Sequence, residues 1–349
     1  MLDLLQLPAY VNVALFLLAA AGVWIAGTRL SIYAEEISDR RRIGKALMGL
    51  IFLAGATSLP EIVTTFTASL ENNAALALNN LFGGIALQTA ILAAADAAVR
   101  NAPLTHFPRK LAPVLEASFL VILLALLQAI IIFGDRQIGL QVGAGTVVLI
   151  AAYFVAIYFL RRFDRRDAWR PVMLPEESDV DEGLGWIAKV RDVSSQMLTW
   201  GFVLAATAVL AFGVLLVETS DALAVQTGLG SSFIGVTLLA ASTSLPELST
   251  TIMAVRLRSY TMAISNIFGS NLIMVALVAP ADILYRPGPI LAQIDPTASF
   301  AIMAGLMVTM IYVIGLVVRS NRQIFGLGLD SATVLGIYLL SLVAFYNLR

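Results

Sequence analysis

The stretch AGATSLPEIVTT, residues 54–65, places a glutamate, Glu61, in the middle of a long apolar segment. A charged side chain at the centre of a bilayer costs about 3 kcal/mol or more, so it is rare there and marks a functional site by default. Nearly the same letters return as ASTSLPELSTT at residues 241–251, again within an apolar segment. Any interpretation of the chain must therefore explain two intramembrane glutamates.

The composition identifies a multi-pass membrane protein. Of the 349 residues, 59% are hydrophobic and 13% are charged, with a mean hydropathy of +0.87. An ordinary soluble domain is about 45–50% apolar and about 25% charged. The absence of cysteine excludes disulfides and thiolate metal sites, and the single histidine, His106, is expected to be an interfacial loop residue. The first apolar segment lacks the basic flank of a signal peptide, which predicts a retained helix.

A spanning helix needs about 20 mostly apolar residues, and the sequence contains ten such segments. They are 9–33, 43–70, 74–98, 111–134, 139–161, 195–220, 231–256, 260–284, 298–318 and 325–347. The longest polar stretch, 162–194, divides five spans from five. We therefore predict a first repeat over 1–161, a cytoplasmic linker over 162–194 and a second repeat over 195–349.

Basic residues give the orientation. Loops after odd-numbered spans carry most of the 22 lysines and arginines, whereas the opposite side has only Arg136, Arg286 and Arg349. The positive-inside rule makes the basic loops cytoplasmic, so both termini are expected outside. We expect a plasma-membrane protein, from a prokaryote, that functions as a monomer.

Residues 49–96 align without a gap on residues 235–282, with 19 identities in 48 positions. Besides the shared TSLPE, the matches include Asn80 with Asn266 and Asp96 with Asp282. Because each half has five spans, an odd number, the halves cross the membrane in opposite directions. The fold class predicted is an all-α membrane protein with ten transmembrane helices in two inverted five-helix repeats. Inverted repeats with interrupted helices are typical of transporters that bind substrate near the midplane.

The TSLPE motif collects oxygen ligands. On a helix, Thr57 and Glu61 are four residues apart and Ser58 and Glu61 are three apart, so all three share one face. Pro60 would leave the Ala56 carbonyl without its helical donor, and such a group in lipid must line a cavity or meet a ligand. Carboxylate, hydroxyl and carbonyl oxygens are the ligands that Ca²⁺ and Na⁺ prefer. The alternative is a proline kink whose glutamate makes a structural hydrogen bond, and two symmetric copies disfavour it.

The second part of each repeat reads LNNLFGGIALQ (78–88) and ISNIFGSNLIM (264–274). Its glycines permit close helix approach, and Asn80 and Asn266 can hydrogen-bond across helices. Asp96 and Asp282 lie near span ends, where interfacial capping is the expected role.

These residues carry a resemblance. Two inverted five-helix halves, each with T-S-L-P-E followed by N-x-x-G, resemble the sodium/calcium exchangers of the calcium/cation antiporter superfamily. The resemblance implies ions bound between spans 2, 3, 7 and 8, and alternating access with spans 1 and 6 sliding across the core. The ligands that it implies are Glu61, Glu247, Thr57, Ser58, Thr243, Ser244, the carbonyls of Ala54 and Ala240, and Ser270.

The sequence also departs from that family. Ala56 and Ser242 stand where a glycine usually precedes T-S, and Gly84 offers no hydroxyl where Ser270 does. At the positions 27 residues after each glutamate, where the family has Asn or Asp, this chain has Gln88 and Met274. Gln88 keeps an oxygen and is counted among the candidate ligands, whereas a thioether is a poor ligand for Ca²⁺ or Na⁺.

The function predicted is secondary antiport of Ca²⁺, or another divalent cation, against Na⁺ or H⁺, with no cofactor and no nucleic-acid partner. The expected partners are inorganic cations and the lipid bilayer. Two alternatives remain open: a cation channel or non-transporting family member, and an intramembrane hydrolase using Glu61 and Glu247 as an acid–base pair. The sequence shows no separate nucleophile–base pair or histidine set, so we expect no enzyme.

Overall fold

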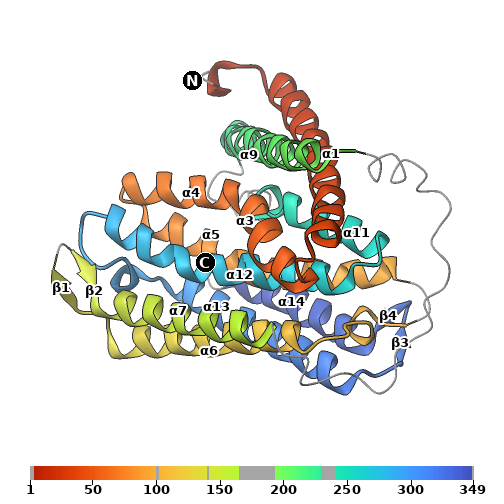
Figure 1. The fold of residues 1–349 in the computed structure, drawn as a ribbon. Coiled ribbons are helices and arrows are strands. Elements are labelled where there is room, and N and C mark those ends of the chain that lie inside the picture. Colours follow the sequence, from red (N-terminus) through yellow and green to blue (C-terminus); the bar gives the residue numbers. More distant parts are fainter. Residues whose placement is uncertain (1–3, 100–101, 140, 165–192, 229–239, 348–349) are drawn as a thin grey trace.

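A computed structural model of the chain describes residues 4–99, 102–139, 141–164, 193–228 and 240–347. Helices account for almost all of it (Figure 1). The main helices are α1 (Ala9–Arg41), α2 (Lys45–Leu47), the π-helical turn η2 (Met48–Leu53), α3 (Ala54–Thr57), α4 (Leu59–Leu70), α5 (Ala74–Ala95), α6 (Ala112–Phe133), α7 (Ala144–Asp164), α9 (Ser195–Gln226), α11 (Leu245–Arg256), α12 (Tyr260–Leu284), α13 (Pro296–Val318) and α14 (Leu329–Asn347).

Seven of the described helices are long and apolar enough to cross a bilayer, and the bent pair formed by residues 45–57 and 59–70 makes up to eight. The other two predicted spans coincide with shorter helices. In α14 the apolar part, Leu329–Phe345, is below the length of a full span. The predicted span 231–256 lies partly outside the described residues, and its described remainder includes the 12-residue α11. Most of the predicted linker 162–194 lies outside them too.

The two longest helices, α1 and α9, lie side by side on one flank of the bundle (Figure 1). With 33 and 32 residues they are about 50 Å long, well beyond the ~30 Å hydrocarbon core, so they must tilt or extend past it. Helix α1 also touches α11: the Ser31 hydroxyl donates to the Thr250 carbonyl at 2.8 Å. Gly27 permits this approach, because a Cβ there would lie 2.0 Å from the Ser249 Oγ.

The helix carrying the first TSLPE motif is broken. Helix α3 ends at Thr57, α4 begins at Leu59, and the two are bent by 50°. Thr57 and Ser58, predicted to share a helix face with Glu61, therefore lie at the break between the two helices. Pro60 lies in the first turn of α4, where its missing N–H is one that would have no helical acceptor, so proline begins a helix rather than kinking one.

Two short antiparallel hairpins interrupt the all-α architecture. Strands β1 (Gln137–Gly139) and β2 (Val142–Gly143) precede α7, and β3 (Gln323–Ile324) and β4 (Leu327–Gly328) precede α14. The hairpins lie at opposite ends of the molecule in Figure 1. This placement follows from the inverted repeat, since each hairpin joins the fourth and fifth helices of its half.

Asp96 and Asp282 hold these hairpins in place through hydrogen bonds, and each aspartate holds the hairpin of the opposite half. Asp96 accepts hydrogen bonds from Leu104 N at 2.5 Å and from Gly328 N at 2.6 Å. Asp282 accepts from Ile290 N at 2.7 Å and from Gly143 N at 2.9 Å. Both carboxylates are buried. The predicted interfacial capping role is thus not what the structure shows: each aspartate ties two distant backbone segments together inside the protein.

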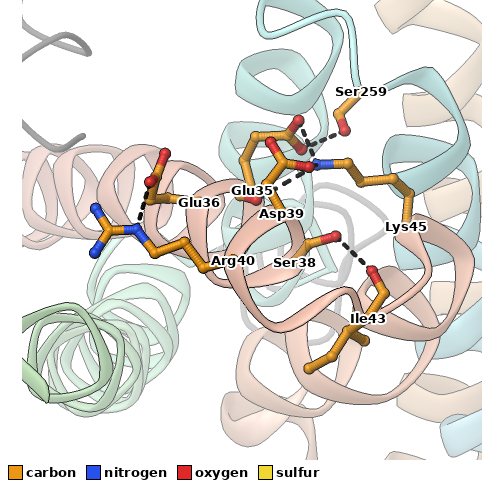
Figure 2. A network of polar contacts seen from close by, with 8 residues as sticks. All are labelled: Glu35, Glu36, Ser38, Asp39, Arg40, Ile43, Lys45 and Ser259. Atoms are coloured by element: carbon orange, nitrogen blue, oxygen red, sulfur yellow. Dashed lines mark hydrogen bonds and ion pairs between the residues drawn. The ribbon is translucent and has the colours of Figure 1, made fainter. Parts of the chain in front are cut away.

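A polar network, shown in Figure 2, joins the C-terminal end of α1 to the neighbouring segments. Lys45, the first residue of α2, forms ion pairs of 2.6 Å with Glu35 and with Asp39. Glu35 also accepts a hydrogen bond from Ser259, the residue preceding α12. The chain reverses at Arg42, which has a left-handed conformation at φ 53°. The end of α1 is therefore tied both to the segment leading to Glu61 and to the start of α12.

Candidate cation site

Glu61 and Glu247, which match each other in the repeat, occupy equivalent positions at the starts of their helices. Glu61 lies in the first turn of α4 and Glu247 in the first turn of α11, with Pro60 and Pro246 beside them. A carboxylate in the first turn interacts favourably with the positive end of the helix dipole. The same break thus recurs in both halves and directs one glutamate from each half into the protein.

Both glutamates are fully buried, and their carboxylates are near enough to repel each other electrostatically. Glu247 Oε1 accepts a hydrogen bond of 3.3 Å from the Ser270 hydroxyl of α12. Ser270 Oγ is in turn 3.4 Å from Thr57 Oγ1 of the other half. Thr57 and Ser58 also lie beside the Glu247 carboxylate. The site is therefore built at the contact between the two repeats.

Several oxygens of the site have no hydrogen-bond partner among the described residues. They include both oxygens of Glu61, Glu247 Oε2, the Ser244 hydroxyl and the side-chain amide oxygen of Gln88. A buried ionised carboxylate is compensated only by ion pairing, hydrogen bonds or metal coordination, and otherwise is costly. Two buried carboxylates with three of their four oxygens lacking a hydrogen-bond partner among the described residues therefore indicate a position that binds positive charge.

The remaining predicted ligands lie on the flanking turns. Thr57 donates to the Ala54 carbonyl at 3.2 Å, and Thr243 donates to the Ala240 carbonyl at 3.1 Å. Both threonines precede the start of the next helix by two residues. Hydroxyl and carbonyl oxygens thus accompany each glutamate in both halves. The structure brings together the glutamates, Thr57, Ser58 and Ser270, whereas the Gln88 side chain has no hydrogen bond to any described residue.

Asparagines support the turns that follow the glutamates. Asn266 Nδ2 donates to Thr250 Oγ1 at 3.0 Å, and Asn80 Nδ2 donates to Thr65 Oγ1 at 3.3 Å, which confirms the predicted bonds across helices. Asn271, which the sequence analysis did not single out, donates to Thr89 of α5 at 3.3 Å. Its position directly after Ser270 in the G-S-N run is the sequence feature that could have indicated this contact.

Close backbone approach positions α12 against the first motif. A Cβ on Gly269 would lie 2.6 Å from the Leu50 carbonyl oxygen and 2.8 Å from the Ala54 Cβ. The π-helical turn η2 lies directly before Ala54 on the same segment. Such π turns occur frequently at functional sites. Gly269 therefore lets Ser270 reach Thr57, as the expectation of close approach requires.

This arrangement suits a hard cation. Among the described residues there is no group of three or more acidic or histidine side chains, so the charge comes from the two glutamates alone. Neutral hydroxyl and carbonyl oxygens make up the rest of the set, which matches the ligand preference of Ca²⁺ and Na⁺. Ions could then be bound near the middle of the bundle at the interface of two inverted halves.

A helical membrane fold built from two repeats, with an acidic site where the repeats meet, is typical of a secondary transporter. The profile of the family described as sodium/calcium exchanger protein matches residues 11–161 and again residues 197–347. The chain belongs to this family, and its function is cation antiport.

Two relatives of known sequence support this assignment to the family. The chain is 24% identical over 285 residues to CaxA of Alkalimonas amylolytica, which is named as an antiporter, covering 82% of this chain and 84% of that protein. It is 25% identical to the inner membrane protein YrbG of Escherichia coli over 332 residues, covering 89% and 93% of the two chains.

The fold is that of the sodium-calcium exchanger NCX_Mj. One structure of that protein, soaked with Na⁺ and Sr²⁺, superposes with a TM-score of 0.67 over 97% of this chain and 99% of that chain. A second, at a lower Sr²⁺ concentration, gives a TM-score of 0.69 over the same shares. Sequence identity is 16% in both cases, so the likeness concerns the fold.

Proposed function

We propose that the chain exchanges Ca²⁺, or a divalent cation of similar chemistry, for Na⁺ or H⁺ at a site centred on Glu61 and Glu247. The observation that carries the proposal is the pair of buried, adjacent carboxylates with unbonded oxygens, one from each inverted half. Thr57, Ser58, Thr243, Ser244, Ser270 and the carbonyls of Ala54 and Ala240 complete the ligand set, and Gln88 is a further candidate.

The proposal includes the topology. Ten spans, two of them represented by the shorter described helices α11 and α14, cross the plasma membrane with both termini outside. The first repeat covers 1–161 and the second 195–349, with residues 162–194 as a cytoplasmic linker. Helices α1 and α9 slide across the core as the site opens to one side and then the other, and one chain performs the complete cycle as a monomer.

The charge of the site sets the stoichiometry. Two carboxylates balance one divalent cation or two monovalent cations, and uncompensated charge in the bilayer centre is expensive. Met274 adds no charge and only a thioether, which is a poor ligand for Na⁺. Two monovalent ions therefore exchange for each divalent ion, and the cycle is electroneutral.

Counterflow in liposomes tests exchange. Labelled Ca²⁺ uptake should require a transported cation inside the vesicle, and a panel of internal ions identifies the counter-ions. A channel would instead allow uptake into vesicles that contain none of them. Repeating the measurement at membrane potentials set with potassium and valinomycin tests electroneutrality. A rate that rises steeply with potential, or a reversal potential that fits three-for-one exchange, would contradict the two-for-one cycle.

A further inference from the structure

The two halves of the cation site are chemically unequal. Glu247 receives the Ser270 hydroxyl, but Glu61 has no hydrogen bond to either oxygen among the described residues. At the constant offset of the repeat, Ser270 corresponds to Gly84, which has no side chain. The first half thus lacks the hydroxyl that the second half supplies.

Met274 occupies the space where that hydroxyl would lie. A Cβ added to Gly84 would be 2.8 Å from Met274 Cε and 3.1 Å from Met274 Sδ. A contact under 3.0 Å requires a shift, which is cheap only where the neighbour is the far end of a flexible side chain that has room to move. Met274 is fully buried, so its side chain cannot swing into solvent to make room. Gly84 and Met274 are therefore a matched pair, in which a missing side chain accommodates a long one.

In the repeat alignment, each of these apolar residues corresponds to a polar residue in the other half. Met274 corresponds to Gln88 in the first half, just as Gly84 corresponds to Ser270. Two hydroxyl groups, those of Ser270 and Thr57, gather on the Glu247 side. On the Glu61 side, the position that corresponds to Ser270 in the repeat is Gly84, and the Met274 thioether lies against it.

We propose that the Gly84–Met274 pair determines how many hard cations the site holds, by filling with a thioether the position that mirrors the Ser270 hydroxyl. Bound cations are held towards Glu247 and Ser270, and a Na⁺ beyond the two that the carboxylates balance finds no oxygen ligand at Gly84. The inference rests on the proposed function, because it concerns the same site.

The test is a set of variants measured by equilibrium binding of labelled Ca²⁺ to the purified full-length protein, with Na⁺ as competitor. Met274→Gln exchanges the thioether for an amide oxygen of similar length and should make Na⁺ compete at a concentration lower by about tenfold or more, as expected for one added ligand to a cation. The double variant Gly84→Ser with Met274→Ala should have a similar effect, since it restores the hydroxyl and the space for it.

Gly84→Ser alone should lower the melting temperature, and Met274→Ala should restore it. Met262→Ala provides the control, because Met262 is also fully buried on α12 but does not face Gly84. It should not rescue Gly84→Ser. Unchanged Na⁺ competition in Met274→Gln, or equal rescue by both alanine variants, would overturn the inference even though wild-type protein binds and exchanges Ca²⁺. Failure of the wild-type protein to bind or exchange any cation would instead refute the proposed function.

Discussion

Replacing Asp282 or Asp96 by asparagine should destabilise the protein strongly, although neither residue belongs to the cation site. Each carboxylate accepts two backbone hydrogen bonds, at 2.5 and 2.6 Å for Asp96 and at 2.7 and 2.9 Å for Asp282. Hydrogen bonds to a charged group contribute about 1.5–3 kcal/mol each. Asparagine keeps one acceptor oxygen, and its amide group faces the second N–H donor, so one bond is lost and a buried donor is left unpaired.

The expected loss is therefore about 2–4 kcal/mol for either variant. For a chain of this length 1 kcal/mol corresponds to about 1.5 °C, so the melting temperature should fall by about 3–6 °C. The two aspartates bind different hairpins, which lie at opposite ends of the molecule in Figure 1, and share no partner, so the effects should add in the double variant.

Thermal unfolding in detergent measures these shifts, and hydrogen exchange shows where the structure loosens. In Asp96→Asn the β3–β4 hairpin should exchange faster, and in Asp282→Asn the β1–β2 hairpin should. Glu71→Gln, at an exposed carboxylate, is the control. If both variants melt within about 1 °C of that control, or if each substitution loosens the hairpin of its own half, the aspartates do not hold the hairpins of the opposite halves.

Three further predictions follow from other parts of the structure. Lys45→Met should remove two partly exposed ion pairs and lower the free energy of unfolding by about 1 kcal/mol in total. Because salt screens exposed charges, this destabilisation should shrink between about 50 and about 500 mM NaCl. A destabilisation that is independent of salt would contradict the prediction. Burial, with a smaller contribution from Arg319, lowers the pKa of His106, so stability should be lost as the pH falls from about 6.5 through the lower folded-state pKa. His106→Gln should remove that part of the pH dependence, which thermal unfolding at a series of pH values measures, and an unchanged profile would refute the assignment. For topology, a cysteine introduced at Arg136 should react with an impermeant thiol reagent in intact cells, whereas one at Arg322 should not; the reverse pattern would invert the proposed orientation.

Much of the architecture was predictable because it depends on local patterns. Apolar length located every long helix that the structure describes, and the matched TSLPE motifs identified both glutamates and the repeat. The predicted bonds of Asn80 and Asn266 are confirmed for the same reason, since a buried amide between helices must find a partner.

What the sequence did not reveal depends on contacts between distant segments. The break at Ser58 depends on how α3 and α4 are held by their neighbours, so a continuous helix was an equally good local interpretation. Asp96 and Asp282 matched in the repeat, but their partners Gly328 and Gly143 lie in the opposite half. The contact of Met274 with Gly84 likewise joins α12 to α5, which no spacing along the chain indicates.

The most direct test of the account is Ca²⁺ counterflow in liposomes containing wild-type protein, Glu61→Gln or Glu247→Gln. Each substitution preserves the shape of the side chain and removes one of the two central charges. We predict that the wild-type protein exchanges labelled Ca²⁺ and that either variant, folded and inserted as shown by an unchanged melting profile, loses exchange almost completely. Near-normal counterflow by either variant would contradict the claim that the two glutamates form the cation site.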